Sequence, residues 1–225
     1  LSTGREQFKQ TLALGVRLVL FLIIPAAVGL IVLGSPVISL LYQHGEFTAA
    51  DTAQTARALL FYLLGTPFAA VDLLLIIAFY SQKDTVTPVV VGIVCVGIYL
   101  LAAPVLAFVL GWGMLGLVAA NSLQLTAHAL ITLWLIRRRV GQWERMGLLA
   151  ALGKVLAASL TMGAATFGVY RLLDLALPGL GIVRQALRLG AAGGVGLAVY
   201  ALTAFWLRVD EARLVLNLVR KKTGH

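Results

Sequence analysis

The sequence predicts an all-α fold, a polytopic transmembrane helix bundle. Of its 225 residues, 60% are hydrophobic and only 12% are charged, and the mean hydropathy is +0.97. A soluble domain of this length cannot hide so large an apolar share from water. The charged residues are concentrated between apolar runs, each long enough to approach the roughly 20 residues that a helix needs to cross a bilayer. The surrounding solvent is therefore expected to be lipid.

Six spans are expected in order along the chain. The first lies in the charge-free stretch between Arg17 and Glu46 and carries Pro25 and Pro36. The second runs from about residue 58 to 81 and is interrupted only by Asp72.

The third and fourth spans share the long stretch between Asp84 and Arg137, which carries no formal charge. Gly111-Trp112-Gly113 supplies a flexible turn, so these two helices are expected to form a tight hairpin. The fifth span covers about residues 147–170, and the sixth about 186–207.

The distribution of basic residues predicts the orientation. Six spans place both ends on one side, where the ends, the Lys83 loop and the 137–145 loop hold twelve Lys and Arg, against four on the other side. The positive-inside rule then puts both ends in the cytoplasm, and the net charge of +9 needs no nucleic-acid partner. The twelve are Arg5, Lys9, Lys83, Arg137, Arg138, Arg139, Arg145, Arg208, Arg213, Arg220, Lys221 and Lys222, and the four are Arg57, Arg171, Arg184 and Arg188. Trp112, Trp134, Trp143 and Trp206 all fall at span ends, where amphipathic rings suit the headgroup layer.

A stripe of polar residues follows the fourth span. Asn121, Gln124, His128 and Thr132 step by three and four residues, so they share one helix face. This stripe is expected to face protein or water, either as interhelical hydrogen bonds that fix packing or as the lining of a cavity. Zinc binding by His128 is not expected, because the other histidines are in a loop and at the terminus.

Asp72 is the only acid deep within a span. An intramembrane carboxylate is costly, which makes it a functional candidate by default. Two interpretations stay open: a structural role, protonated or paired with a basic residue of another helix, and a role in ion or proton coupling. Arg17 and Lys154 lie near span ends and are expected to reach the headgroups instead.

Small residues recur every four positions in the last two spans. The fifth has Gly153, Ala157, Thr161 and Ala165, and the sixth has Ala186, Gly190, Gly194 and Ala198. Such faces permit close helix packing. The alternative is a smooth groove for an acyl or prenyl chain.

No catalytic constellation is found in the sequence. It has no Gly-rich phosphate loop, HExxH pair or nucleophile elbow, and its single cysteine, Cys95, allows no intrachain disulfide or thiol metal site. An enzyme is therefore disfavoured, and neither a cofactor nor a metal is expected.

Two loop motifs are more specific. The first span leaves through Gly45-Glu46-Phe47-Thr48, and the second through Phe79-Tyr80 followed by Asp84-Thr85-Val86-Thr87-Pro88. Asp84 is suited to cap a helix that begins near Thr87-Pro88. With these motifs the chain resembles the MurJ/MviN family of lipid II flippases, within the multidrug/oligosaccharidyl-lipid/polysaccharide exporter superfamily. Many relatives have a basic residue just before Phe79-Tyr80, whereas this chain has Ile76-Ile77-Ala78.

The resemblance implies fourteen helices in the whole protein, with these as the last six. Residues 1–138 would form four spans of the second six-helix lobe, and residues 139–225 the two extra C-terminal helices with a basic cytoplasmic tail. In the family those extra helices border a groove proposed to hold the undecaprenyl tail. The chain begins Leu1-Ser2-Thr3-Gly4 without an initiator methionine, which also predicts a fragment.

The function that the resemblance implies is transport. The whole protein would move lipid II, an undecaprenyl-pyrophosphate-linked peptidoglycan precursor, from the inner to the outer leaflet of the bacterial cytoplasmic membrane by alternating access. Its partners would be that precursor, membrane lipids and the missing N-terminal lobe. The alternatives are another polysaccharide-lipid flippase, a cation-coupled drug exporter of the same superfamily and a non-transporting membrane scaffold.

Overall fold

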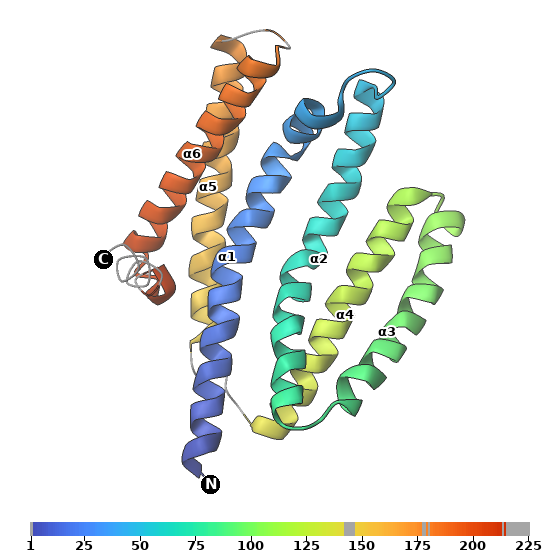
Figure 1. The fold of residues 1–225 in the computed structure, drawn as a ribbon, viewed down its shortest axis with the longest axis vertical. Coiled ribbons are helices and arrows are strands. Elements are labelled where there is room, and N and C mark those ends of the chain that lie inside the picture. Colours follow the sequence, from blue (N-terminus) through green and yellow to red (C-terminus); the bar gives the residue numbers. More distant parts are fainter. Residues whose placement is uncertain (1, 142–146, 177–178, 180, 213, 215–225) are drawn as a thin grey trace. The chain divides into compact units, whose positions relative to one another are not determined.

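The chain folds into six long helices (Figure 1). The computed structural model describes residues 2–141, 147–176, 179, 181–212 and 214. All six helices are long and apolar enough to cross a membrane, and within these residues there is no strand. The predicted all-α class and the six spans are confirmed, and the chain is a multi-pass membrane protein. The helices are α1 Ser2–Tyr42, α2 Ala49–Ser81, α3 Val86–Pro104 continued by the π-helix η1 Val105–Val109, α4 Met114–Val140, α5 Leu148–Ala176 and α6 Ile182–Trp206.

Several helices are longer than the predicted spans. Helix α1 begins at Ser2 rather than near Arg17, and α2 begins at Ala49 rather than near residue 58. A search for uncharged residues finds only the apolar middle of a helix, because polar turns continue the same hydrogen-bond ladder beyond it. The prolines inside α1 and α2 do not end these helices, as is common where apolar surroundings leave the backbone no water to bond.

The chain forms two compact units, and α1 and α2 each contribute to both. Unit 1 contains residues 1–23 and 57–149, and unit 2 contains residues 24–56 and 150–225. These units do not coincide with the predicted ranges 1–138 and 139–225, whose assignment to lobes stays a prediction. Trp143, Arg145, Arg213, Arg220, Lys221 and Lys222 lie outside the described residues.

Unit 1 is held by an apolar core and a tight hairpin. Leu12 of α1, Phe79 of α2 and Ile136 of α4 belong to one buried cluster. Gly111 and Gly113 have positive φ angles of 69° and 55°, which confirms Gly111-Trp112-Gly113 as the turn between the third and fourth spans. One turn later, a Cβ on Gly116 would lie 2.6 Å from the backbone of Leu106 and Ala107, so only glycine permits this approach.

Unit 2 packs α5 against α1 and against α6. A Cβ on Gly163 would lie 2.8 Å from the Val28 side chain, and one on Gly196 would overlap the Thr166 hydroxyl. The buried residues of α6 include Ala192, Gly196, Tyr200 and Ala204, which define the face that α6 turns toward the unit. Close contact therefore depends on small residues, as expected for helices in lipid.

Candidate functional site

A buried acid and a histidine pair inside unit 1. Asp72 Oδ2 of α2 lies 2.7 Å from His128 Nδ1 of α4, and the two side chains are 12% and 14% exposed. The sequence singled out both residues, but separately, one as an intramembrane acid and one as part of the polar stripe. The partner of Asp72 is thus a histidine of the same chain, rather than a lysine or arginine.

The pair lies in close-packed surroundings. A Cβ on Gly92 of α3 would lie 3.8 Å from His128 Nε2, so α3 covers the ring, and Cys95 of α3 is fully buried. Asp72 Oδ1 is buried and accepts no hydrogen bond within the described part of the chain. For the 2.7 Å contact to be a hydrogen bond, either the imidazole or the carboxyl must donate. The contact therefore joins α2 to α4 inside the span.

The remaining stripe residues differ in burial. Thr132 is fully buried, and its hydroxyl donates to the His128 carbonyl at 2.7 Å and lies 3.3 Å from His128 Nδ1. Asn121 and Gln124 are half-buried, whereas Leu123 is 49% exposed. No group of three or more His, Cys, Asp and Glu residues that could hold a metal occurs among the residues that the structure describes.

The Phe79-Tyr80 and Asp84 motif builds the connection between α2 and α3. The backbone N–H of Asp84 donates to the Phe79 carbonyl, and that of Lys83 donates to Tyr80, with Lys83 at φ 60°. This pair of bonds ends α2 in the Schellman pattern, in which a non-glycine residue is uncommon at the left-handed position. The Asp84 carboxylate then accepts from the backbone N–H of Thr87 at 2.9 Å and from its hydroxyl at 2.6 Å. The predicted cap is confirmed, and α3 begins at Val86, with Pro88 in its first turn.

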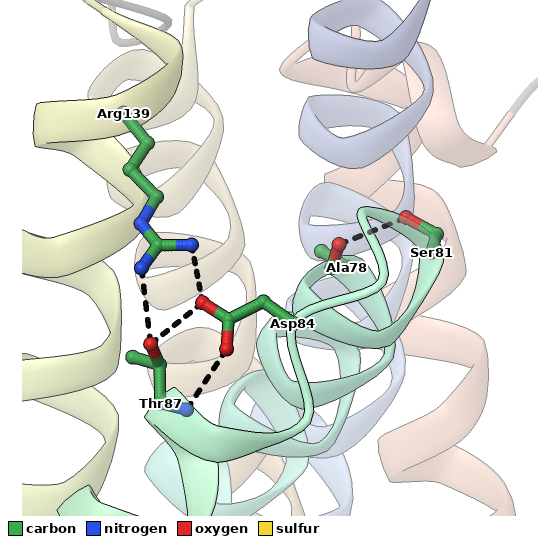
Figure 2. A network of polar contacts seen from close by, with 5 residues as sticks. All are labelled: Ala78, Ser81, Asp84, Thr87 and Arg139. Atoms are coloured by element: carbon green, nitrogen blue, oxygen red, sulfur yellow. Dashed lines mark hydrogen bonds and ion pairs between the residues drawn. The ribbon is translucent and has the colours of Figure 1, made fainter.

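Arg139 fastens this loop to the end of α4. Figure 2 shows its guanidinium bonded to the Asp84 carboxylate and, at 3.0 Å, to the Thr87 hydroxyl. The same guanidinium lies 5.2 Å from the centroid of the buried Phe79 ring, and the Arg139 carbonyl accepts from Arg5 of α1. Sequence reasoning assigned Arg139 to topology alone. The pairing of Arg139 with Asp84 could not be predicted, because the two residues are far apart in the chain and periodicity within one helix gives no information about contacts between helices.

This loop network predicts a pH dependence. Hydrogen bonds from the Thr87 hydroxyl and backbone, helped by Arg139, lower the pKa of Asp84 to about 2. A carboxyl with a lowered pKa adds stability that is fully present above its unfolded pKa and is lost as the pH falls toward the folded one. We expect the melting temperature of Asp84→Asn to lie below that of the wild type at neutral pH, with the gap closing between about pH 4 and about pH 2. Thermal unfolding in detergent measures it.

The control for this measurement is Glu6→Gln. Glu6 is 58% exposed and pairs with Lys9 one turn along α1, so its removal should change the melting temperature little at any pH. A gap for Asp84→Asn that is the same at neutral and acidic pH would show that the charge of Asp84 does not stabilise the loop.

The Gly45 and Phe47 motif shapes the connection between α1 and α2. Gly45 has a φ of 64°, and the Phe47 ring packs against Tyr42 with 6.1 Å between centroids. The Thr48 backbone N–H donates to the Asp51 carboxylate at 2.8 Å, while the Asp51 N–H donates to the Thr48 hydroxyl at 3.3 Å. These reciprocal bonds form a capping box that starts α2. Both loop motifs thus have a local structural role.

Comparison with known proteins decides the family. The family described as "Lipid II flippase MurJ" matches residues 2–177. The chain belongs to this family. The matched range includes the Asp72–His128 pair and both loop motifs of the MurJ resemblance, and it ends before α6.

Curated relatives carry the same name. A probable lipid II flippase MurJ of Bdellovibrio bacteriovorus is 31% identical over 134 residues, 60% of this chain and 25% of that protein. One of Vibrio cholerae is 37% identical over 120 residues, 52% of this chain and 22% of that protein. A third, of Rhizobium meliloti, is 27% identical over 208 residues, 92% of this chain and 38% of that protein. The chain thus spans well under half the length of these MurJ relatives.

The small-residue ladder of α6 faces away from the packed side of its unit. Ala186, Gly190, Gly194 and Ala198 are all exposed, and a Cβ on Gly190 or Gly194 would meet nothing within 4 Å. On α5, Gly153 is likewise open. Within unit 2 the close contacts are made by Gly163 and Gly196, which lie on other faces. The packing interpretation of the ladders, against another part of the protein, therefore stays a prediction. The groove interpretation for MurJ stays a prediction.

Proposed function

We propose that this chain is the C-terminal part of a flippase that moves lipid II, an undecaprenyl-pyrophosphate-linked peptidoglycan precursor, across the membrane. The observation that carries the proposal is the family match over residues 2–177, joined to six helices of spanning length. The protein is a transporter rather than an enzyme in this proposal. Its substrate path is completed by an N-terminal lobe, since the relatives are several times longer than the regions they share with this chain.

Transport in this proposal proceeds by alternating access of two lobes. The Asp72–His128 pair is the proposed intramembrane polar site of this part of the protein. The contact between Oδ2 and Nδ1 links α2 to α4, so the gain or loss of a proton at this pair would change a contact between two spans. If the two conformations bind the cation with different affinity at this contact, a cation gradient favours one conformation over the other.

The outward ladder of α6 is the proposed seat for the lipid tail. Its four residues lack bulky side chains, and neighbouring exposed leucines give an apolar surround, among them Leu187 at 61% and Leu197 at 68% exposure. An apolar furrow of this kind suits a prenyl chain, because the chain gains close contact without displacing packed helices.

The proposed location is the bacterial cytoplasmic membrane, with both ends of this chain inside. In unit 1, Arg5 of α1 meets Arg139 at the end of α4, and Arg139 meets the Asp84 loop. The start of α1, the end of α4 and the Asp84 loop, each of which carries basic residues, therefore lie at the same end of the unit. This supports placing all three on the same side of the membrane.

Cysteine labelling tests this orientation in the full-length protein. In a Cys95→Ala background, single cysteines in the 137–145 loop and at the C-terminus should resist an impermeant thiol reagent in intact cells, whereas Glu46→Cys should react. All three should react after the cells are permeabilised. Labelling of the first two positions from outside, with Glu46→Cys protected, would invert the topology.

Complementation tests the proposed activity. The full-length gene should restore growth and cell shape to bacteria depleted of their own lipid II flippase. Membrane insertion is checked in the same cells by immunoblotting. A protein that inserts normally and leaves the cells dying would instead favour a drug exporter or a scaffold.

A further inference from the structure

A polar cavity lies within unit 2, away from the Asp72–His128 pair. Its volume is about 360 Å³, in the range of small-molecule sites. Four helices contribute residues: the end of α1, the start of α2, the end of α5 and the start of α6, each labelled in Figure 1. Among its lining residues are Ser39, Gln43, Thr52, Asp174, Gln185 and Arg188. All six of these side chains are polar, and Pro36, Ala49 and Ala53 add apolar surface to the wall.

The charges in the cavity wall balance. Arg188 is 4% exposed, and its guanidinium bonds the Asp174 carboxylate and, at 2.8 Å, the Gly179 carbonyl. Its Nε is buried with no hydrogen-bond partner in the part of the chain that the structure describes. Asp174 is 45% exposed and also lines the cavity. The more accessible member of this ion pair is therefore the carboxylate.

The uncharged groups are held in fixed orientations. Gln43 Oε1 accepts from the Ser39 hydroxyl at 2.6 Å and from the Thr52 hydroxyl at 3.3 Å, which leaves its amide NH2 as a donor. Gln185 is buried, and its NH2 donates to the Pro36 carbonyl at 3.3 Å, which leaves its amide oxygen as an acceptor. The residues of this wall thus include both hydrogen-bond donors and acceptors.

We propose that this cavity binds the hydroxyl groups of a saccharide. A hydroxyl both donates and accepts, so it satisfies Gln43, Gln185 and the Asp174 carboxylate in turn. An anion would face the Asp174 carboxylate, and an apolar group would leave buried amides unsatisfied. Tyr170, also in the wall, offers an apolar ring surface beside these polar groups.

The source of the saccharide follows from the position of the cavity. It is built from helix ends, which lie at the membrane–water boundary, so a saccharide carried on a lipid reaches it from the bilayer surface. This identification rests on the proposed function, since a lipid-linked saccharide is its substrate class, but binding can be measured without transport.

The test measures saccharide binding to the full-length protein in nanodiscs. The probes are N-acetylglucosamine, its β-1,4-linked disaccharide, a monoglucosyl diacylglycerol placed in the nanodisc, and inorganic phosphate. Saturation-transfer NMR follows the soluble probes, and native mass spectrometry follows the lipid. We expect saturable binding of at least one saccharide probe, weakened about tenfold or more by Gln43→Leu and by Gln185→Leu, because each removes one polar contact.

Controls separate a lost site from a damaged fold. Gln10→Leu removes an exposed amide from α1 in unit 1 and should leave binding unchanged. Each variant must keep the wild-type melting temperature to be counted. Thr52→Val provides a milder cavity variant if either glutamine replacement fails to fold. Binding of the glycolipid alone would assign the site to lipid-linked saccharides, and binding of the soluble probes would extend it to free ones.

Two results would overturn the proposal. One is saturable phosphate binding in the absence of saccharide binding, which would make the cavity an anion site. The other is no saturable binding of any saccharide probe by folded protein. Neither depends on flipping, so a protein that binds saccharide but fails to transport would refute the proposed function and leave this site standing.

Discussion

Replacing His128 by leucine is expected to cause the largest loss of stability among single changes in the spans. Removing one partner of a buried ion pair costs about 3–5 kcal/mol, whereas interhelical hydrogen bonds in membranes average about 0.6 kcal/mol. Asp72 Oδ1 has no hydrogen-bond partner in the described part of the chain, and loss of His128 also removes the contact of Oδ2. The expected loss in the free energy of unfolding therefore lies nearer the larger figure, and denaturation in mild detergent measures it.

The double variant Asp72→Leu/His128→Leu should recover most of that stability, since no buried charge is then left alone. Thr126→Val is the matched control on α4, because the Thr126 hydroxyl bonds the Ser122 carbonyl of its own helix. In the full-length protein, a stable double variant that no longer transports would support a coupling role. Equal stability of His128→Leu and Thr126→Val would contradict the pairing.

Two glycines of α6 should respond in opposite ways to added bulk. Gly196→Val is expected to lower the free energy of unfolding by about 1–3 kcal/mol, because its Cβ would overlap the Thr166 hydroxyl. Thr166 is 2% exposed and β-branched, so it has little freedom to move aside. Gly194→Leu meets open space and should leave the melting temperature near that of the wild type.

The same pair separates packing from lipid contact. If the outward ladder seats the prenyl tail, Gly194→Leu should reduce flipping by the full-length protein while the fold stays intact. Leu100→Ala, on the exposed surface of α3 in unit 1, serves as a control for a general change in lipid contact. Normal flipping by Gly194→Leu would remove the ladder from the substrate path, and lowered stability of this variant would reveal a helix contact there.

The sequence was sufficient for the number and order of the spans, because hydropathy reports directly on the solvent around each helix. It was less informative about helix ends, since α1 continues through Arg5 and Lys9 on polar turns. The Asp84 cap was predictable because it joins residues three positions apart. The contacts of Arg139 were not predictable, because they join segments that are distant in the chain.

The faces of α5 and α6 show the same limit. Two faces of α6 carry small residues at four-residue spacing. One face runs through Gly194, and the other consists of Ala192, Gly196, Tyr200 and Ala204, in which only Tyr200 is large. Periodicity identifies a face but does not say which face meets a neighbour. The structure makes that choice by placing Gly196 against Thr166. The partner of Asp72 was hidden for the same reason, since two polar residues on different helices carry no sign of their pairing.

Translocation by the purified full-length protein tests the central proposal most directly. Undecaprenyl-pyrophosphate-linked disaccharide-pentapeptide with a fluorescent peptide label is placed in proteoliposomes, and a membrane-impermeant quencher reports the fraction in the outer leaflet over time. Protein-dependent movement of this lipid, with no movement of a labelled phospholipid, is the predicted result. Movement no faster than in protein-free vesicles, by a protein shown to be folded and inserted, would contradict the proposal.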